Sequence, residues 1–248
     1  NIRYMNVEKL LSEKVKSLSE SATLRMSQLA TELKRSGKEV ISLSLGEPDF
    51  DTPSHIKKAA KKALDDGYTK YTPVPGLHEL REAISQKLKR DNQLDYNIDQ
   101  IVVSNGAKQS IANLVSATIN PGDEGILFAP YWVSYYDILQ LAGGTPVCIK
   151  TSIDNDYKVS PEQLKEAITE KTKFILFSSP CNPTGSVYSE AELRELAEVI
   201  KDTNILVISD EIYEYINFTE EHFSIGRIES VKDQVVTVNG FSKAFPMT

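Results

Sequence analysis

The segment Val235-Val-Thr-Val-Asn-Gly-Phe-Ser-Lys-Ala-Phe-Pro-Met-Thr248 joins a short β-branched run to a lysine through a break at Asn-Gly. β-Branched residues favour strands, and Asn-Gly ends them. Lys243 therefore stands just beyond the carboxyl end of a predicted strand at 235–238. Its small neighbours leave room for the amine to reach an aldehyde, which is the chemistry of a Schiff base.

Upstream of this segment, apolar strands alternate with amphipathic helices. The predicted strands are 101–104, 125–129, 145–150, 173–177 and 205–209, and the predicted helices are 107–119, 132–141, 161–169 and one that begins after Ser189. Ser160-Pro-Glu-Gln163 and Ser189-Glu-Ala-Glu192 have the capping-box pattern of a helix start. This alternation predicts an α/β fold with a mostly parallel central sheet and helices on both faces.

The first hundred residues are predicted to be mainly helical. Helices are expected at 24–35, 56–64 and 77–89, with a short strand at 40–45. We expect residues 1–50 to form an N-terminal arm and part of a smaller α/β domain. Residues 51–248 are expected to form the large domain.

Composition narrows the class of protein. The 248 residues carry a formal net charge of −7, which argues against a nucleic-acid or anionic-membrane partner. No apolar run approaches the roughly 18 residues of a membrane span, so the cytoplasm is the expected compartment. Cys148 and Cys181 lack CxxC spacing, and the three histidines are scattered. We therefore expect no disulfide framework and no metal site.

Polar residues follow several of the predicted strands, where parallel sheets bind their ligands. Ser104-Asn-Gly-Ala-Lys108 is a turn into a helix, whose exposed amides could cradle a phosphate. Asp210 follows an apolar run, where a carboxylate is costly unless a cation such as a pyridinium nitrogen is near. Tyr213 and Asn182 could contact a cofactor oxygen, and Trp132 could stack on a flat ring. Taken singly, each residue also fits a turn, a cap, core packing or, for Lys243, the surface.

Together these segments resemble class I aminotransferases of the aspartate aminotransferase fold, which use pyridoxal 5'-phosphate (PLP; fold type I). The similarity is strongest to the bacterial aspartate aminotransferase branch and runs from about Ser21 to Thr248. The matching motifs are Ser44-Leu-Gly-Glu-Pro-Asp-Phe50, Lys70-Tyr-Thr-Pro-Val74, Ser104-Asn-Gly-Ala-Lys-Gln109, Pro130-Tyr-Trp-Val-Ser134, Asn182-Pro-Thr-Gly185, Asp210-Glu-Ile-Tyr213 and Gly240-Phe-Ser-Lys243. The large domain would then be the PLP-binding domain.

The resemblance implies a role for each matching residue. Lys243 would form the internal aldimine and move the substrate proton, Asp210 would pair with the pyridine nitrogen, and Tyr213 and Asn182 would contact the phenolic oxygen. The remaining cofactor contacts would come from Gly106, Ala107, Lys108, Trp132, Ser242 and, across a homodimer with shared sites, Tyr71. The substrate would be bound by Gly46, Lys108, Trp132 and Asn182. In this branch the position of Lys108 is associated with the distal carboxylate of acidic substrates, so the expected reaction moves an amino group between aspartate or glutamate and a 2-oxo acid.

Three departures from the family pattern stand out. Cys181 replaces an asparagine or histidine, and Gly240 replaces a phosphate-binding serine. Relatives also continue past the position of Thr248, with an arginine that grips the phosphate and another that clamps the substrate carboxylate. The chain thus resembles the N-terminal two-thirds of an aminotransferase, and we expect a protein ending there to lack ordinary transaminase turnover.

Other functions stay open at the level of sequence. A lyase of the same fold would share the lysine, aspartate and asparagine, and a prephenate- or aromatic-preferring transaminase would differ only around the substrate. A non-catalytic binding protein is disfavoured by the intact Lys243, Asp210 and Tyr213. A nicotinamide oxidoreductase is disfavoured because no GxGxxG follows a strand.

Overall fold

The computed structural model describes residues 7–18, 22–43, 46–218 and 221–248. The chain divides into two compact units, residues 1–47 and residues 48–248. The first contains the 3-10 helix η1 (Val7–Leu10) and the helices α1 (Glu13–Lys16) and α2 (Ala22–Arg35). Helix α2 confirms the helix predicted at 24–35. The strand predicted at 40–45 is wrong for residues 40–43, which pair with no strand in the described chain, and residues 44 and 45 lie outside it.

The second unit is built around five parallel strands. They are β1 (Glu124–Ala129), β2 (Thr145–Lys150), β3 (Thr172–Ser178), β4 (Leu206–Asp210) and β5 (Val235–Val238). The helices are α3 (Ser54–Asp65), α4 (His78–Asn92), α5 (Ala107–Thr118), α6 (Ser134–Ala142), α7 (Pro161–Ala167) and α8 (Glu190–Ile200). Four 3-10 turns complete it, η2 (Ile98–Gln100), η3 (Ile153–Asn155), η4 (Ile225–Arg227) and η5 (Lys232–Gln234). The predicted α/β class is confirmed.

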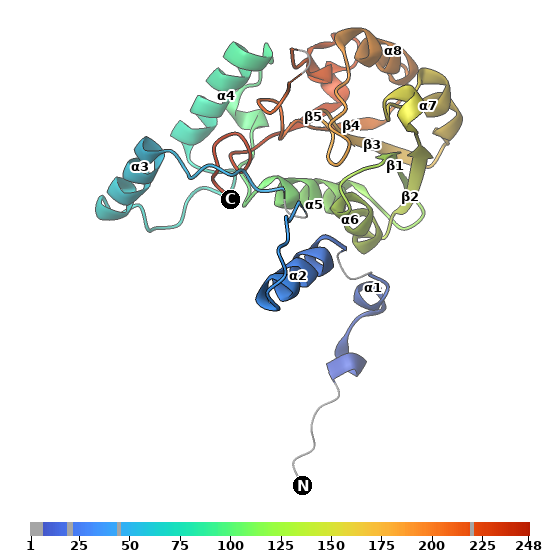
Figure 1. Ribbon diagram of the computed structural model, residues 1–248. Helices are drawn as coiled ribbons and strands as arrows, with labels where there is room; N and C mark the ends of the chain where they lie inside the picture. Colours follow the sequence, from blue (N-terminus) through green and yellow to red (C-terminus); the bar gives the residue numbers. More distant parts are fainter. Residues whose placement is uncertain (1–6, 19–21, 44–45, 219–220) are drawn as a thin grey trace. The chain divides into compact units, whose positions relative to one another are not determined.

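The order of the strands across the sheet is β2-β1-β3-β4-β5. The chain places β2 on one side of β1 and then crosses back to place β3, β4 and β5 on the other side. The strand order therefore reverses between β1 and β3. Helices α5 and α6 cover one face, whereas α7 and α8 cover the other (Figure 1). In open sheets of this kind ligands bind outside the carboxyl ends of the strands at the reversal point.

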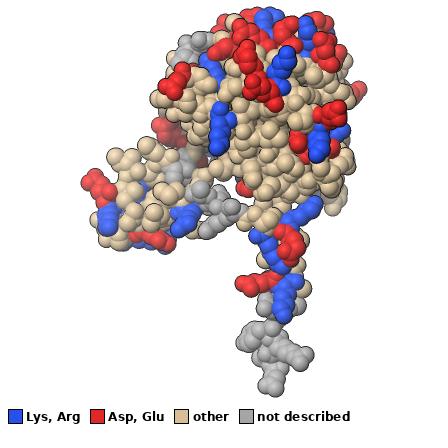
Figure 2. All heavy atoms as spheres, turned by 90° about the vertical axis from the view of Figure 1, so that its right-hand side faces the viewer, with Lys and Arg blue, Asp and Glu red and all other residues tan. Residues whose placement is uncertain are grey.

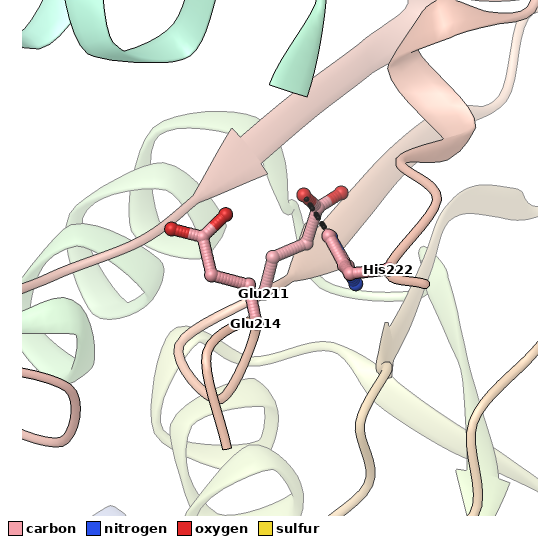
Figure 3. Close-up of side chains that lie close together, drawn as sticks. All are labelled: Glu211, Glu214 and His222. Carbon is pink, nitrogen blue, oxygen red and sulfur yellow. Dashed lines mark hydrogen bonds and ion pairs between the residues drawn. The ribbon is translucent and has the colours of Figure 1, made fainter. Parts of the chain in front are cut away.

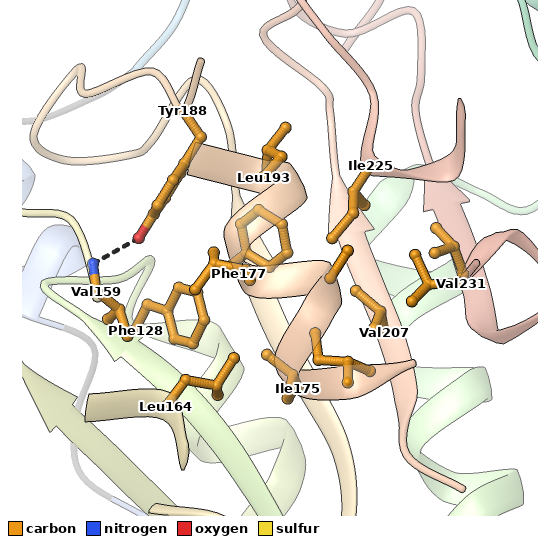
Figure 4. Close-up of a cluster of buried hydrophobic side chains, with 14 of the residues drawn as sticks. Phe128, Val159, Leu164, Ile175, Phe177, Tyr188, Leu193, Val207, Ile225 and Val231 are labelled. Carbon is orange, nitrogen blue, oxygen red and sulfur yellow. Dashed lines mark hydrogen bonds between the residues drawn. The ribbon is translucent and has the colours of Figure 1, made fainter. Parts of the chain in front are cut away.

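Strand β3 shows why the sheet needs helices on both faces. Successive side chains of β3 alternate between the two faces. Phe174 and Leu176 pack toward α5 and α6, whereas Ile175 and Phe177 pack toward α7 and α8. All four side chains are buried, so the strand has no polar face. The cluster on the α8 side is closed by the Tyr188 hydroxyl, which accepts a hydrogen bond from the Val159 backbone amide at 2.7 Å (Figure 4). Burial of this apolar area is the main stabilising contribution to the sheet.

Local sequence signals decide where the helices begin. The Ser160 side chain accepts from the Gln163 amide at 3.3 Å, and the Gln163 side chain accepts from the Ser160 amide at 3.0 Å. Ser189 and Glu192 make the same reciprocal pair at the start of α8. Both predicted capping boxes are confirmed, because each satisfies amides that have no partner inside the helix.

The strand predicted at 101–104 is wrong. These residues have extended character in their sequence but form no strand, and Val103 instead donates one backbone hydrogen bond to the Pro75 carbonyl at 3.0 Å. A β-branched run becomes a strand only where a neighbour supplies a ladder. Here the neighbour is a loop, so the segment serves as an extended lead into α5.

The surface over α7 and α8 carries both signs of charge. Figure 2 shows acidic and basic side chains interspersed on this face rather than gathered into a basic stripe. Among the described residues, no helix has the length and apolar character needed to cross a bilayer.

Candidate active site

The sheet register brings the ends of three strands level. Ser178 of β3 pairs with Asp210 of β4, and Asp210 pairs with Val238 of β5. The loops that follow these strands carry Asn182, Tyr213 and Lys243. Residues far apart in the chain therefore meet at one edge because their strands are parallel and in register.

Asp210 is the buried acid of this edge. Its side chain is 4% exposed, and the Tyr135 hydroxyl donates to Oδ2 at 2.5 Å while the Ile212 amide donates to Oδ1 at 3.2 Å. Burial raises the pKa of the Asp210 carboxyl to about 6, although both hydrogen bonds oppose this rise. The charge of Glu211 raises this pKa further, and that of Lys243 lowers it. The site thus holds a carboxyl group that gains from an added cation.

Lys243 and Tyr213 face one another. The Lys243 Nζ lies 5.8 Å from the centroid of the Tyr213 ring. Burial raises the pKa of the Tyr213 hydroxyl, and a side-chain hydrogen bond with Asn182 acts in the opposite direction. The structure therefore brings an amine, a phenol, an amide and the Asp210 carboxyl into one electrostatically coupled group.

The turn before α5 provides exposed backbone amides. Gly106 is the N-cap with φ of +87°, a conformation that glycine adopts at little cost. A side chain at this position would have open space but a strained backbone. The amides of Ala107 and Lys108 are the first two of the helix and have no intrahelical acceptor. A helix start of this kind favours an anion such as phosphate.

Trp132 connects this turn to Asp210. The Lys108 Nζ lies 4.8 Å from the Trp132 ring centroid, and the Trp132 and Tyr135 rings meet edge to face at 5.5 Å. Tyr135 in turn donates to Asp210. The contacts form a continuous path from the α5 N-terminus to the buried acid, across the reversal point of the sheet.

The other three expected site residues are Tyr71, Gly46 and Ser242. Tyr71 is fully exposed, and Gly46 belongs to the first unit, which is described separately. Ser242 is half-buried, and its carbonyl accepts from the Thr248 hydroxyl at 3.4 Å. Their predicted roles remain predictions.

Cys181 and Gly240, which are expected to differ from the family pattern, each lie against a neighbouring loop. The Cys181 thiol donates to the Pro130 carbonyl at 3.5 Å, which links the loops after β3 and β1. A Cβ atom at Gly240 would lie 2.9 Å from Ile212 Cδ1. A serine at position 240 would therefore require the Ile212 side chain to move.

Sequence reasoning missed two features of the site. Tyr135 was one of several aromatic residues near Trp132, and nothing in the chain marked it as the donor to Asp210. The structure also gathers Glu211, Glu214 and His222 so that their potential ligand atoms lie within 4.8 Å of one another. Glu211 directly follows Asp210 in an apolar segment, and this position indicates a buried carboxyl group that needs a partner. No sequence spacing identified His222 as that partner.

Comparison with known proteins identifies the family. The family profile described as "Aminotransferase class I and II" matches residues 38–248. The chain belongs to this family. It is 48% identical over 244 residues to an aspartate aminotransferase of Bacillus sp. (strain YM-2), a match that covers 98% of this chain and 62% of the relative. It is also 48% identical over 242 residues to a probable aspartate/prephenate aminotransferase of Rickettsia bellii, covering 96% of this chain and 61% of the relative.

The solved structures of aminotransferases extend the comparison to the fold. The aspartate aminotransferase from Thermus thermophilus with maleate superposes with a TM-score of 0.92 at 43% identity, over 96% of this chain and 62% of that one. The chain thus spans less than two-thirds of the length of these relatives. The family and its fold are established over this part.

Proposed function

We propose that this protein is a PLP-dependent aminotransferase that moves an amino group between aspartate or glutamate and a 2-oxo acid. The observation that carries the proposal is the convergence of Lys243, Asp210, Tyr213 and Asn182 at the carboxyl edge of the sheet. The names of the Bacillus and Rickettsia relatives support the same reaction.

The described residues fit PLP. Asp210 is a carboxyl group whose pKa is raised by burial, so a cationic partner such as a pyridinium nitrogen would stabilise its ionised form. The open turn at Gly106 and the first amides of α5 suit the phosphate. Trp132 is half-buried beside Tyr135 and offers a ring face for stacking.

When bound, PLP supplies an aldehyde that takes up an amine and a conjugated ring that withdraws electrons from the attached carbon. Lys243 would hold the group through its aldehyde, and its Nζ would carry the proton that leaves the substrate Cα. Asp210 would hold the ring nitrogen in its protonated form. The Tyr213 hydroxyl and the Asn182 amide would donate to the phenolic oxygen.

Lys108 supports an acidic substrate. Its side chain is exposed at the α5 N-terminus, and its Nζ lies over the Trp132 ring at 4.8 Å. A flexible ammonium group there suits the distal carboxylate of aspartate or glutamate. Prephenate is the second candidate acceptor, favoured by the name of the Rickettsia relative.

A homodimer with shared sites is part of this proposal. The Tyr71 side chain is fully exposed, and Val74 beside it is almost so. A phenol presented in this way could reach a phosphate bound by a second copy of the chain. Light scattering of the purified protein, together with the PLP affinity of Tyr71→Phe, tests both parts. The cytoplasm stays the predicted compartment.

The decisive experiment is the near-ultraviolet and visible spectrum of the protein at its full natural length, before and after addition of L-aspartate. We expect a PLP absorption band that converts on addition of aspartate and returns with 2-oxoglutarate, with glutamate formed in equal amount. Lys243→Ala should abolish this cycle, whereas Lys165→Ala, at an exposed position of α7, should leave it unchanged. Release of ammonia without glutamate would instead identify a lyase.

A further inference from the structure

Two glutamates flank the residues proposed to hold the cofactor. Glu211 follows Asp210, and Glu214 follows Tyr213. Both are buried, with Glu211 only 1% exposed, and they lie close to the ring of His222 (Figure 3). Burial of two acids in one turn requires specific partners.

Glu211 has three donors. The Ser209 hydroxyl donates to Oε1 at 2.9 Å, and the Ser224 hydroxyl donates to the same oxygen at 2.6 Å. His222 Nε2 lies 2.9 Å from Oε2, and because a carboxylate oxygen only accepts, the tautomer with a proton on Nε2 donates to it.

Glu214 is held from another direction. The Lys87 ammonium and the Asn92 side-chain amide, both on α4, donate to its two carboxylate oxygens. Lys87 also donates to the Asn92 side-chain oxygen at 2.7 Å. The turn is thus fixed to α4 at one end and to the 222–224 segment at the other.

These contacts explain the acidic group without a metal ion. The Lys87 ammonium already supplies the positive charge for Glu214, and the Nε2 proton of His222 is directed at Glu211. A cation would have to displace these donors from both carboxylates. The geometry of this acidic group is that of an anchoring network.

The anchored turn carries the proposed catalytic groups. The Glu211 amide donates to the Val238 carbonyl at 2.8 Å, and the Glu214 amide donates to the Glu211 carbonyl at 3.0 Å. Within the turn, the Ile212 amide donates to Asp210 at 3.2 Å. A shift of the Glu211 backbone would therefore displace both the Ile212 amide, which donates to Asp210, and the backbone that presents Tyr213.

We propose that Glu211, held by His222, is a positioning residue that sets the orientation of Asp210 and Tyr213 in the aminotransferase site. The inference rests on the proposed function. It assigns the buried pair a role in the reaction beyond support of the fold, since the groups that it fixes would contact the ring nitrogen and the phenolic oxygen of PLP. The Glu211 charge also acts directly on Asp210.

The test uses His222 variants of matched size in the protein at its full natural length. His222→Gln keeps a donor near the position of Nε2, whereas His222→Leu removes it. We expect His222→Leu to lower kcat for aspartate about tenfold with KM changed less than threefold, because positioning acts on the transition state. His222→Gln should restore kcat to within about threefold of the parent.

A second readout separates positioning from stability. The pH midpoint of the PLP absorption band should shift by about 0.5 or more in Glu211→Gln and His222→Leu, because the charges and donors near the ring change. Glu195→Gln, at an exposed position of α8, is the control and should leave the midpoint unchanged. Thermal unfolding of every variant shows which ones are folded.

The outcomes distinguish the two proposals. A parent protein that transfers amino groups, with variants that keep its kcat and its spectral midpoint, overturns the positioning role alone. Loss of thermal stability without a spectral shift overturns it as well. A parent protein that binds no PLP overturns the proposed function and this inference with it.

Discussion

Asp210 and Glu211 are consecutive buried acids at the end of β4, yet their surroundings differ. Asp210 faces the α6 side and has one hydroxyl and one amide donor. Glu211 faces the opposite side and has three side-chain donors. A carboxylate can accept about four hydrogen bonds, so Asp210 retains more capacity for an incoming cation. The less satisfied acid is the one proposed to pair with the ligand, whereas the better satisfied acid is the one proposed to hold the turn in place.

The largest expected effect comes from removal of the Asp210 charge. Asp210→Asn keeps the size of the side chain but cannot hold a proton on the ring nitrogen. We expect turnover of aspartate to fall by about 100-fold or more, as for loss of a central electrostatic partner. Steady-state kinetics of Asp210→Asn and Glu211→Gln, measured in parallel, checks this expectation. Equal losses of turnover in the two variants would show that the two acids do not have different roles.

Removal of the Tyr135 hydroxyl, the side-chain donor to Asp210, should have the second largest effect. Tyr135→Phe removes the hydroxyl that lies 2.5 Å from Oδ2. This change should raise the pKa of Asp210 further, because that hydrogen bond lowers it. We expect about 1–3 kcal/mol of lost stability and about tenfold lower turnover. Urea unfolding and kinetics measure both, and Tyr136→Phe, at the next position of α6, is the matched control.

The pH dependence of the free energy of unfolding of the apoprotein tests the state of Asp210 in the absence of cofactor. The pKa of Asp210 is raised from 3.8 to about 6, so the folded apoprotein binds this proton more tightly than the unfolded chain. The contribution of Asp210 to stability is therefore greatest at low pH and falls as pH rises toward 6. Relative to Asp210→Asn, we expect a loss of about 2 kcal/mol between about pH 4.5 and 7.

Urea unfolding of the two apoproteins across this range measures the loss. Bound PLP should reduce it, because a pyridinium partner lowers the pKa of Asp210. A difference that stays constant with pH would show that burial does not raise this pKa.

The smallest effect is expected on the Glu211 side. Ser224→Ala removes one of three donors, and Ser209 and His222 remain. We expect a loss of about 1 kcal/mol of stability with turnover changed less than threefold. A loss of turnover as large as that of Tyr135→Phe would show that each donor to Glu211 is needed for positioning.

Much of the fold was predictable from local pattern. The strands at 125–129, 145–150, 173–177, 205–209 and 235–238 all appear within one or two residues of their predicted bounds, because near-continuous apolar runs can be buried only in a two-sided sheet. The failures at 40–43 and 101–104 have one cause. A strand depends on a neighbour that its own residues do not specify.

The sequence by itself determined the α/β class, the starts of α7 and α8, and the placement of Asp210, Tyr213 and Lys243 at or just after the ends of strands. These features depend on nearest neighbours along the chain, through periodicity, capping and turn chemistry. Only the tertiary structure decided that Tyr135 is the donor to Asp210 and that His222 and α4 hold the glutamates beside it. Those contacts join segments distant in the chain, and they exist because parallel strands in register bring their ends to one edge.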